Sequence, residues 1–300
     1  MLNGIINIHK EAGFTSHDVV AKMRGICRQK KIGHTGTLDP QATGVLPVCL
    51  GSATKLCDML TDKDKEYVAE LLLGQTTDTQ DTTGRILTEH PVMVSCEEIR
   101  TAVMSFVGEY EQIPPMYSAL KINGKKLYEL AREGKEVERA ARPVHISEIE
   151  ILEMKLPVVK LRVVCSKGTY IRTLCADIGD KLGCGGTMQS LVRTRVGNFK
   201  LEDAVPLGQL ESLRDEEKIQ EVLLPVDCVF HECPSLHVQE KWRKLLDNGN
   251  SFYPNQTVEN YSYREGEWVR VYHENHSFAG IYTYDSGRKW YKPVKMFLET

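Results

Sequence analysis

The sequence contains no long apolar run. None of its segments approaches the roughly 18 consecutive apolar residues that a membrane-spanning helix needs. Residues 1–8 also lack the basic start and long apolar centre of a signal peptide, so we expect them to form a strand. Hydrophobic residues make up 41% and charged residues 26% of the 300 residues, which is typical of soluble globular proteins. We therefore expect a cytoplasmic protein without membrane contact, long enough for one large and one small domain.

Closely spaced cysteine pairs are also missing. The chain has nine cysteines, none of them arranged as Cys-x-x-Cys, whereas structural zinc sites need closely spaced ligands. Cys228 and Cys233 flank His231, and we favour packing over a metal site as the explanation for this group. Because the number of cysteines is odd and no export signal is present, we expect reduced thiols. No metal is predicted.

An excess of positive charge is absent as well. The net charge of −3 argues against a protein that binds nucleic acid over its whole surface, but a local basic face would suffice for phosphate contacts. Residues 19–38 contain no acidic side chain, and Thr15 and Asp18 are suited to begin a helix just before them. The basic residues of this region form either a solvated helix face or an RNA-phosphate contact: Lys22, Arg24, Arg28, Lys30 and Lys31.

A glycine- and proline-rich loop is predicted over residues 33–47. Asp39 is its one carboxylate, and Pro40 directs the backbone of Asp39 toward an extended conformation. His34 precedes Asp39 by five residues, so the loop is a candidate catalytic site. An ordinary turn and a backbone cradle for phosphate are the alternatives. A phosphate-loop hydrolase is a poor match, because no Gly-Lys-Ser/Thr follows.

Residues 33–46, Gly-His-Thr-Gly-Thr-Leu-Asp-Pro-x-Ala-Thr-Gly-Val-Leu, closely resemble the signature of the TruB family, the tRNA pseudouridine-55 synthases. Several other strings are similar to signatures of this family, and the resemblance covers about residues 1–200 strongly and the remainder weakly. These strings are Lys65-x-Tyr67 with the polar segment 73–84, Pro-Pro-x-Tyr-Ser-Ala-x-Lys at 114–121, Gly-Thr-Tyr-Ile-Arg at 168–172 and Leu-x-Arg-Thr-Arg-Val-Gly at 191–197.

The resemblance implies a mixed α/β (α+β) architecture, the pseudouridine synthase fold, with a large and mainly antiparallel sheet flanked by helices. We expect this catalytic domain to span residues 1–230. Residues 231–300 are expected to form a small β-rich domain, with a helix at 239–246 and aromatic-rich strands at 267–272, 278–284 and 289–297. This tail weakly resembles a PUA-like RNA-binding module. Arg288, Lys289, Lys292 and Lys295 are interleaved with Trp290 and Tyr291 in it.

The activity implied by the resemblance is isomerisation of uridine 55 in the T arm of tRNA to pseudouridine. The base leaves C1′ through N1, turns over and rejoins through C5, so no cofactor is required. Asp39 matches the nucleophile, and addition to C6 of the base and attack at C1′ both remain open. Arg172 is the expected partner that keeps a buried Asp39 carboxylate ionised.

The remaining site residues are carried over from matching motif positions. Tyr67 is expected to stack on the flipped-out uridine or to transfer a proton beside its sugar. His34 is expected to fill the space that the base vacates or to stack on a neighbouring base. Tyr170 and Leu191 are expected to line the pocket. Lys10 matches a basic residue of the N-terminal motif, in which Glu11 replaces the usual proline, and is expected to contact the substrate.

The expected partner is the tRNA T-arm stem-loop, bound by a monomer. An RNA-binding or tRNA-folding protein on the same scaffold, with chemistry secondary, is the alternative function. Phosphate and stacking contacts would serve both functions, whereas Asp39, Arg172 and Tyr67 together favour the isomerase.

Overall fold

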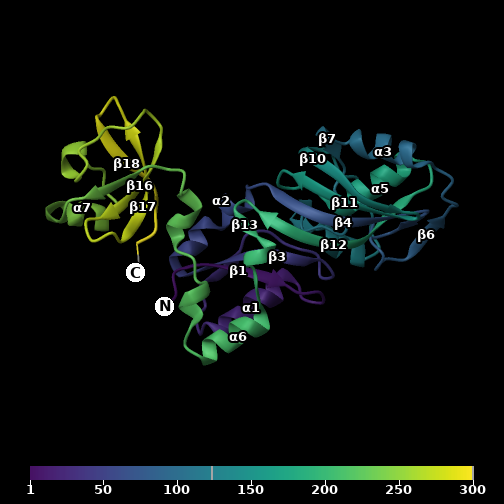
Figure 1. Cartoon of the computed structure of the whole chain (residues 1–300), viewed down its shortest axis with the longest axis horizontal. Coiled ribbons are helices and arrows are strands. Elements are labelled where there is room, and N and C mark those ends of the chain that lie inside the picture. Colours follow the sequence, from purple (N-terminus) through teal and green to yellow (C-terminus); the bar gives the residue numbers. More distant parts are fainter. Residues whose placement is uncertain (123, 299–300) are drawn as a thin grey trace.

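The computed structural model describes residues 1–122 and 124–298. A ten-stranded sheet forms the centre of the larger part, and a four-stranded sheet forms the C-terminal part (Figure 1). In the large sheet the strand order is β14-β1-β3-β12-β4-β11-β10-β7, with β13 paired to β12 and β2 paired to β3. Its strands are β1 (Gly4–Lys10), β2 (Ile32–His34), β3 (Thr43–Leu50), β4 (Lys65–Leu73), β7 (Gly108–Gln112), β10 (Arg142–Lys155), β11 (Val158–Cys165), β12 (Gly186–Val196), β13 (Phe199–Lys200) and β14 (Val205–Pro206).

Within the described residues, only β1 with β14 and β12 with β3 pair in parallel in this sheet, so the expected mainly antiparallel sheet is confirmed. The N-terminal strand is also confirmed as β1. No helix in the described ranges is both long and apolar enough to cross a membrane.

Helices cover both ends of the sheet (Figure 1). On β1 and β3, Ile6, Ile8 and Leu46 pack against Val19 and Met23 of a helix and Leu210 of another. At the other end, apolar side chains of two helices pack on β4, β10, β11 and β12. The helices are α1 (Ser16–Ile26), α2 (Cys57–Thr61), α3 (Cys96–Met104), α4 (Leu127–Arg132), α5 (Ile171–Lys181), α6 (Leu207–Asp215) and α7 (Arg243–Asp247).

Local sequence explains where two of these helices begin. Thr15 accepts a hydrogen bond from the Asp18 backbone, and the Asp18 side chain accepts one from the Thr15 backbone. Ser95 and Glu98 form the same reciprocal arrangement before α3. Each pair satisfies backbone N–H groups that have no partner inside the helix. The helix expected near Thr15 is therefore confirmed.

Short elements connect the two sheets and decorate the larger one. Among them, β8 and β9 form a hairpin where the sequence Asn-Gly at 123–124 predicts a tight turn, although Asn123 itself lies outside the described residues. The short strands are β5 (Gln75–Thr77), β6 (Ile86–Glu89), β8 (Lys121–Ile122) and β9 (Lys125–Lys126), and the 3-10 turns are η1 (Gly51–Leu56), η2 (Leu201–Asp203), η3 (Ile219–Val222), η4 (Val226–Phe230), η5 (Glu240–Trp242) and η6 (Pro254–Gln256).

The C-terminal sheet has the strand order β15-β16-β17-β18, with β15 (Ser235–Val238), β16 (Trp268–His273), β17 (Phe278–Asp285) and β18 (Trp290–Met296). Its three aromatic-rich strands agree with the expected ones within two residues. The helix expected at 239–246 is instead split into η5 and α7, because Trp242 N–H bonds the Gln239 carbonyl and closes a tighter first turn. Ile281 and Phe297 pack with Ile5 and Val45, so the small sheet shares a core with the large one.

Candidate active site

The loop that carries Asp39 joins β2 to β3, which pair in antiparallel fashion through His34 and Val48. Three backbone contacts hold the loop in place. Thr35 N–H donates to the Pro47 carbonyl (3.2 Å), and Gly13 N–H donates to the Pro40 carbonyl (2.9 Å). Leu38 N–H donates to the buried Ser16 hydroxyl at the start of α1 (2.9 Å). The segment before α1, the beginning of α1 and β3 therefore fix the backbone around Asp39.

Gly44 permits the close approach of β3 to β12. Its φ of +106° lies in the region that side-chain-bearing residues avoid. A Cβ at this position would overlap the carbonyl oxygen of Arg193 on β12. The loop thus returns to the sheet where only glycine fits.

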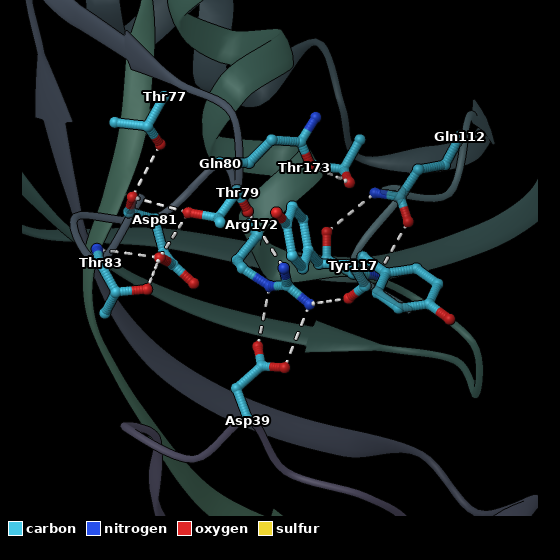
Figure 2. A network of polar contacts seen from close by, with 11 residues as sticks. Asp39, Thr77, Thr79, Gln80, Asp81, Thr83, Gln112, Tyr117, Arg172 and Thr173 are labelled. Atoms are coloured by element: carbon cyan, nitrogen blue, oxygen red, sulfur yellow. Dashed lines mark hydrogen bonds and ion pairs between the residues drawn. The ribbon is translucent and has the colours of Figure 1, made fainter. Parts of the chain in front are cut away.

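Asp39 and Arg172 form a two-point ion pair (Figure 2). Arg172 Nε lies 2.8 Å from Asp39 Oδ2, and Arg172 Nη2 donates to Asp39 Oδ1 at 3.1 Å. The Arg172 side chain is 5% exposed, whereas the Asp39 side chain is 34% exposed. This geometry aims the carboxylate while leaving it accessible from the surface.

Two backbone carbonyls hold Arg172 from its other side. Nη1 donates to the Thr79 carbonyl (3.0 Å) and Nη2 donates to the Tyr117 carbonyl (2.8 Å). The polar loop that carries Thr79 is organised around Asp81, whose carboxylate accepts hydrogen bonds from Thr79 Oγ1 (2.8 Å) and Thr83 N–H (3.0 Å) (Figure 2). Three segments whose sequences resemble TruB signatures therefore meet at the guanidinium of Arg172.

Tyr67 and Leu191 pack beside the loop. Both are buried in a core cluster that includes Leu38 and Ala42 of the loop. Burial is the largest influence on Tyr67 and raises the pKa of its phenol. Tyr67 faces Arg193 across the β4–β12 pair, and the positive charge of Arg193 opposes this rise in the pKa of Tyr67. Tyr67 therefore presents a neutral phenol near Asp39.

Tyr170 immediately precedes α5, two residues before Arg172. A pair of hydrogen bonds to Gln112 fixes its backbone: Tyr170 N–H donates to Oε1 (2.8 Å), and Nε2 donates to the Tyr170 carbonyl (3.0 Å). Tyr170 is half-buried, and burial raises the pKa of its phenol. The same contacts help to position Arg172 on the first turn of α5.

His34 lies at the entry to the loop, half-buried and in edge contact with His17 at 5.6 Å between ring centres. Desolvation by burial, reinforced by His17 and Arg193, lowers the pKa of His34 to about 4. His34 Nδ1 accepts a hydrogen bond from Gly36 N–H at 3.3 Å. A neutral imidazole suits stacking on a base better than phosphate binding.

Lys10 lies beneath the loop. Its side chain is fully buried, and Nζ donates to the carbonyls of Ala42 (2.6 Å), Pro40 (3.0 Å) and Glu11 (3.1 Å). Burial lowers the pKa of Lys10 to about 8, and the negative charge of Asp39 opposes this shift. The contacts that Lys10 makes in the structure support the loop. A direct contact between Lys10 and the substrate stays a prediction.

Metal-ligating side chains do not converge here. No group of three or more His, Cys, Asp or Glu residues in the described part of the chain is arranged to hold a metal ion. Cys228 and Cys233 instead pack against the apolar cluster that contains Phe230.

Sequence reasoning brought Asp39, Arg172, Tyr67, Tyr170, Leu191 and His34 into one site but missed part of their support. The missed groups are the carbonyls of Thr79 and Tyr117, the side chain of Gln112 and the guanidinium of Arg193. Thr79, Tyr117 and Arg193 lie inside segments that resemble family signatures, and this resemblance could have marked them as part of the site. Gln112 precedes such a string and carried no signal.

Comparisons with known proteins point to one family. The family model "TruB family pseudouridylate synthase (N terminal domain)" matches residues 24–171, and "tRNA pseudouridylate synthase B C-terminal domain" matches residues 172–231. The chain is 52% identical to tRNA pseudouridine synthase B of Lachnoclostridium phytofermentans, covering 99% of this chain and 100% of the relative. It is 48% identical to the protein of the same name from Alkaliphilus oremlandii, covering 99% of each.

Solved structures share the fold. The protein in "Crystal Structure of a Cbf5-Nop10-Gar1 Complex" has a TM-score of 0.73 and 27% identity, covering 98% of this chain and 85% of that one. The protein in "Crystal structure of the archaeal box H/ACA sRNP Nop10-Cbf5 complex" has a TM-score of 0.71 and 28% identity, covering 99% and 86%. The mixed α/β fold with a small C-terminal sheet is therefore confirmed. This chain belongs to the TruB family of pseudouridylate synthases.

Proposed function

We propose that this chain isomerises uridine 55 in the T arm of tRNA to pseudouridine, with Asp39 as the nucleophile. The observation that carries the proposal is the two-point ion pair of Asp39 with Arg172, in which the carboxylate is aimed by a buried guanidinium and still reachable. Relatives that match essentially the whole chain are named tRNA pseudouridine synthase B.

The reaction breaks the bond between C1′ and N1 and forms a bond between C1′ and C5. Asp39 supplies the anionic oxygen, either by adding to C6 of the base or by attacking C1′. Arg172 aims the carboxylate, because its guanidinium binds both carboxylate oxygens. The atoms of substrate and product are the same, so the reaction needs no cofactor.

The target uridine must leave its stack to reach Asp39. Extrusion costs a few kcal/mol, which stacking and edge contacts in the pocket offset. Tyr67, Leu191 and Tyr170 supply apolar and aromatic surface beside Asp39. His34, which burial keeps neutral, is placed to stack on a neighbouring base or to occupy the vacated position.

The RNA is expected to bind as a T-arm stem-loop across basic surfaces. The basic residues of α1 and the segment after it are exposed, as are Arg288, Lys289 and Lys292 near β18. Phosphate contacts of this kind position the RNA without reading its sequence. We assign residues 231–300 to an RNA-binding domain, and chemistry to a domain of residues 1–230 that also contacts the RNA, in a monomeric cytoplasmic protein.

An RNA-folding role without essential chemistry is the second candidate. The same basic and aromatic surfaces would support it. The Asp39–Arg172 pair favours catalysis, since a buried guanidinium aims a reachable carboxylate, an arrangement that RNA binding alone does not need.

The deciding assay incubates the protein with unmodified tRNA transcript and maps pseudouridine along it. Pseudouridine at position 55, and its loss in a transcript with cytidine at that position, supports the proposal. Binding without pseudouridine would favour the RNA-folding role. Pseudouridine at other positions alone would show that the substrate assignment is wrong.

A further inference from the structure

Among the described residues, Arg193 is the largest fully buried side chain, at 1% exposure on β12. Its Nε donates to the Val45 carbonyl at 2.7 Å, and its Nη2 donates to the Gly36 carbonyl at 3.2 Å. Gly36 lies on the entry side of the Asp39 loop and Val45 on the exit side. One guanidinium thus ties both sides of the loop to the central sheet.

No carboxylate in the described ranges forms an ion pair with Arg193. Buried charges are normally paired with an opposite charge, because desolvation of an isolated ion costs several kcal/mol. Arg172, which is also buried, follows that rule through Asp39. Arg193 departs from it, since two carbonyls accept its hydrogen bonds and a phenol, not a carboxylate, is its neighbour across the strand pair.

The phenol is that of Tyr67, the cross-strand neighbour of Arg193. A guanidinium can only donate hydrogen bonds, so toward Arg193 the Tyr67 oxygen can act only as an acceptor. The Tyr67 hydroxyl proton must then point away from Arg193. Burial raises the pKa of Tyr67, while the nearby positive charge of Arg193 opposes that rise. Arg193 therefore orients the Tyr67 proton and stabilises the phenolate that forms when the proton leaves.

The proposed isomerisation needs a proton exchange of this kind, because N1 must gain a proton and C5 must lose one. We propose that Arg193 is a positioning residue for Tyr67, holding its phenol so that Tyr67 protonates N1 of the uracil and takes back the proton that C5 releases. The O–H electron pair stays on the phenolate oxygen beside Arg193 until the C5 proton arrives. The exchange is balanced and leaves Tyr67 neutral. This inference rests on the proposed function.

The test measures single-turnover pseudouridine formation on a T-arm stem-loop, together with its affinity for the protein. We expect Arg193→Gln to slow the reaction about 10²-fold, within the range of general acid–base catalysis, while affinity changes less than about twofold. Arg193→Lys, which keeps the charge, should retain more activity. Arg195→Gln is the matched control, since Arg195 lies two residues along the same strand and donates to Gly197 instead.

Two measurements separate positioning from a merely structural role. In a Tyr67→Phe protein, Arg193→Gln should cause little further loss, because residues that act as a unit are not additive. Replacement of Tyr67 by the more acidic 3,5-difluorotyrosine should restore activity to Arg193→Gln or, if that variant does not fold, to Arg193→Lys.

Additive losses without rescue by difluorotyrosine would overturn the inference. An inactive wild-type protein would instead overturn the proposed function, so the two failures are distinguishable.

Discussion

Arg172 binds both carboxylate oxygens of Asp39, at 2.8 and 3.1 Å, although 133 positions separate the two residues in the chain. Asp39 is held on a short loop before β3, and Arg172 lies on the first turn of α5. Because the guanidinium also donates to two backbone carbonyls, its position does not depend on Asp39 alone. The Asp39–Arg172 pair is therefore already in place before the substrate binds.

Substitution of Asp39 by Asn should abolish pseudouridine formation and leave T-arm binding nearly intact. The amide keeps the shape of the side chain but removes the anionic oxygen that attacks the nucleoside. Mapping of pseudouridine and a binding titration on the same RNA would check this. Full activity in the variant would remove Asp39 from the mechanism.

Substitution of Arg172 by Lys should slow single-turnover catalysis about 10²-fold or more, since a small misplacement of a reacting group has that effect. Lysine keeps the charge but lacks the planar fork that reaches Asp39 and both carbonyls at once. Rates at saturating RNA test the prediction. We expect little loss of folding stability, because Asp39 is one-third exposed and water compensates part of its charge. A rate close to that of the wild type would contradict the assigned role.

Substitution of Gly44 by Ala should destabilise the protein by about 2–4 kcal/mol. The strain of a positive φ and the overlap of the new Cβ with the Arg193 carbonyl both contribute. Gly208 in α6 is the control, since a Cβ there meets open space and alanine favours helix by up to about 1 kcal/mol. Urea unfolding of both variants measures their stabilities. Equal midpoints for Gly44→Ala and Gly208→Ala would refute the prediction.

The stability difference between the wild type and His34→Asn should depend on pH. The pKa of His34 is lowered to about 4 in the folded protein, below its ordinary value of 6.5. The unfolded chain therefore binds more protons in this interval, and the wild type loses stability as the pH falls from 6.5 toward 4. The loss relative to the variant should reach roughly 3 kcal/mol at about 1.4 kcal/mol for each pKa unit. Unfolding of both proteins at pH 7 and at pH 4.5 gives the stability difference at each pH. An equal difference at the two pH values would disprove a buried neutral imidazole.

Replacement of Lys289 and Lys292 by Glu should weaken tRNA binding more than it slows chemistry. Both side chains are exposed, beside or on β18 and far in sequence from Asp39. Each lost phosphate contact should lower the slope of affinity against salt by about one. Lys218→Glu, between α6 and η3, reverses one charge and is the control for each of the two single variants. Unchanged affinity in the double variant would mean that this surface does not bind RNA. Deletion of residues 231–300 is a harsher test, because Ile281 and Phe297 are part of a shared core.

Local chemistry determined much of this protein. The capping pairs at Thr15 and Ser95 mark the beginnings of two helices because neighbouring side chains satisfy the backbone there. The glycines and Pro40 around Asp39 likewise restrict their own backbone, so the loop could be predicted before any contact was known. The resemblance then placed Arg172, Tyr67 and Leu191 with that loop.

Only the tertiary structure decided what each of these groups touches. Lys10 was expected to reach substrate, yet it donates to three carbonyls beneath the loop. Backbone carbonyls such as those of Thr79 and Tyr117 are the same in every residue, so no side-chain pattern identifies them as partners of Arg172. The role of Arg193 depends on strand register, which places it opposite Tyr67 and against both sides of the loop. Such pairings arise from packing across distant segments, and a one-residue shift in register would turn Arg193 to the other face of the sheet.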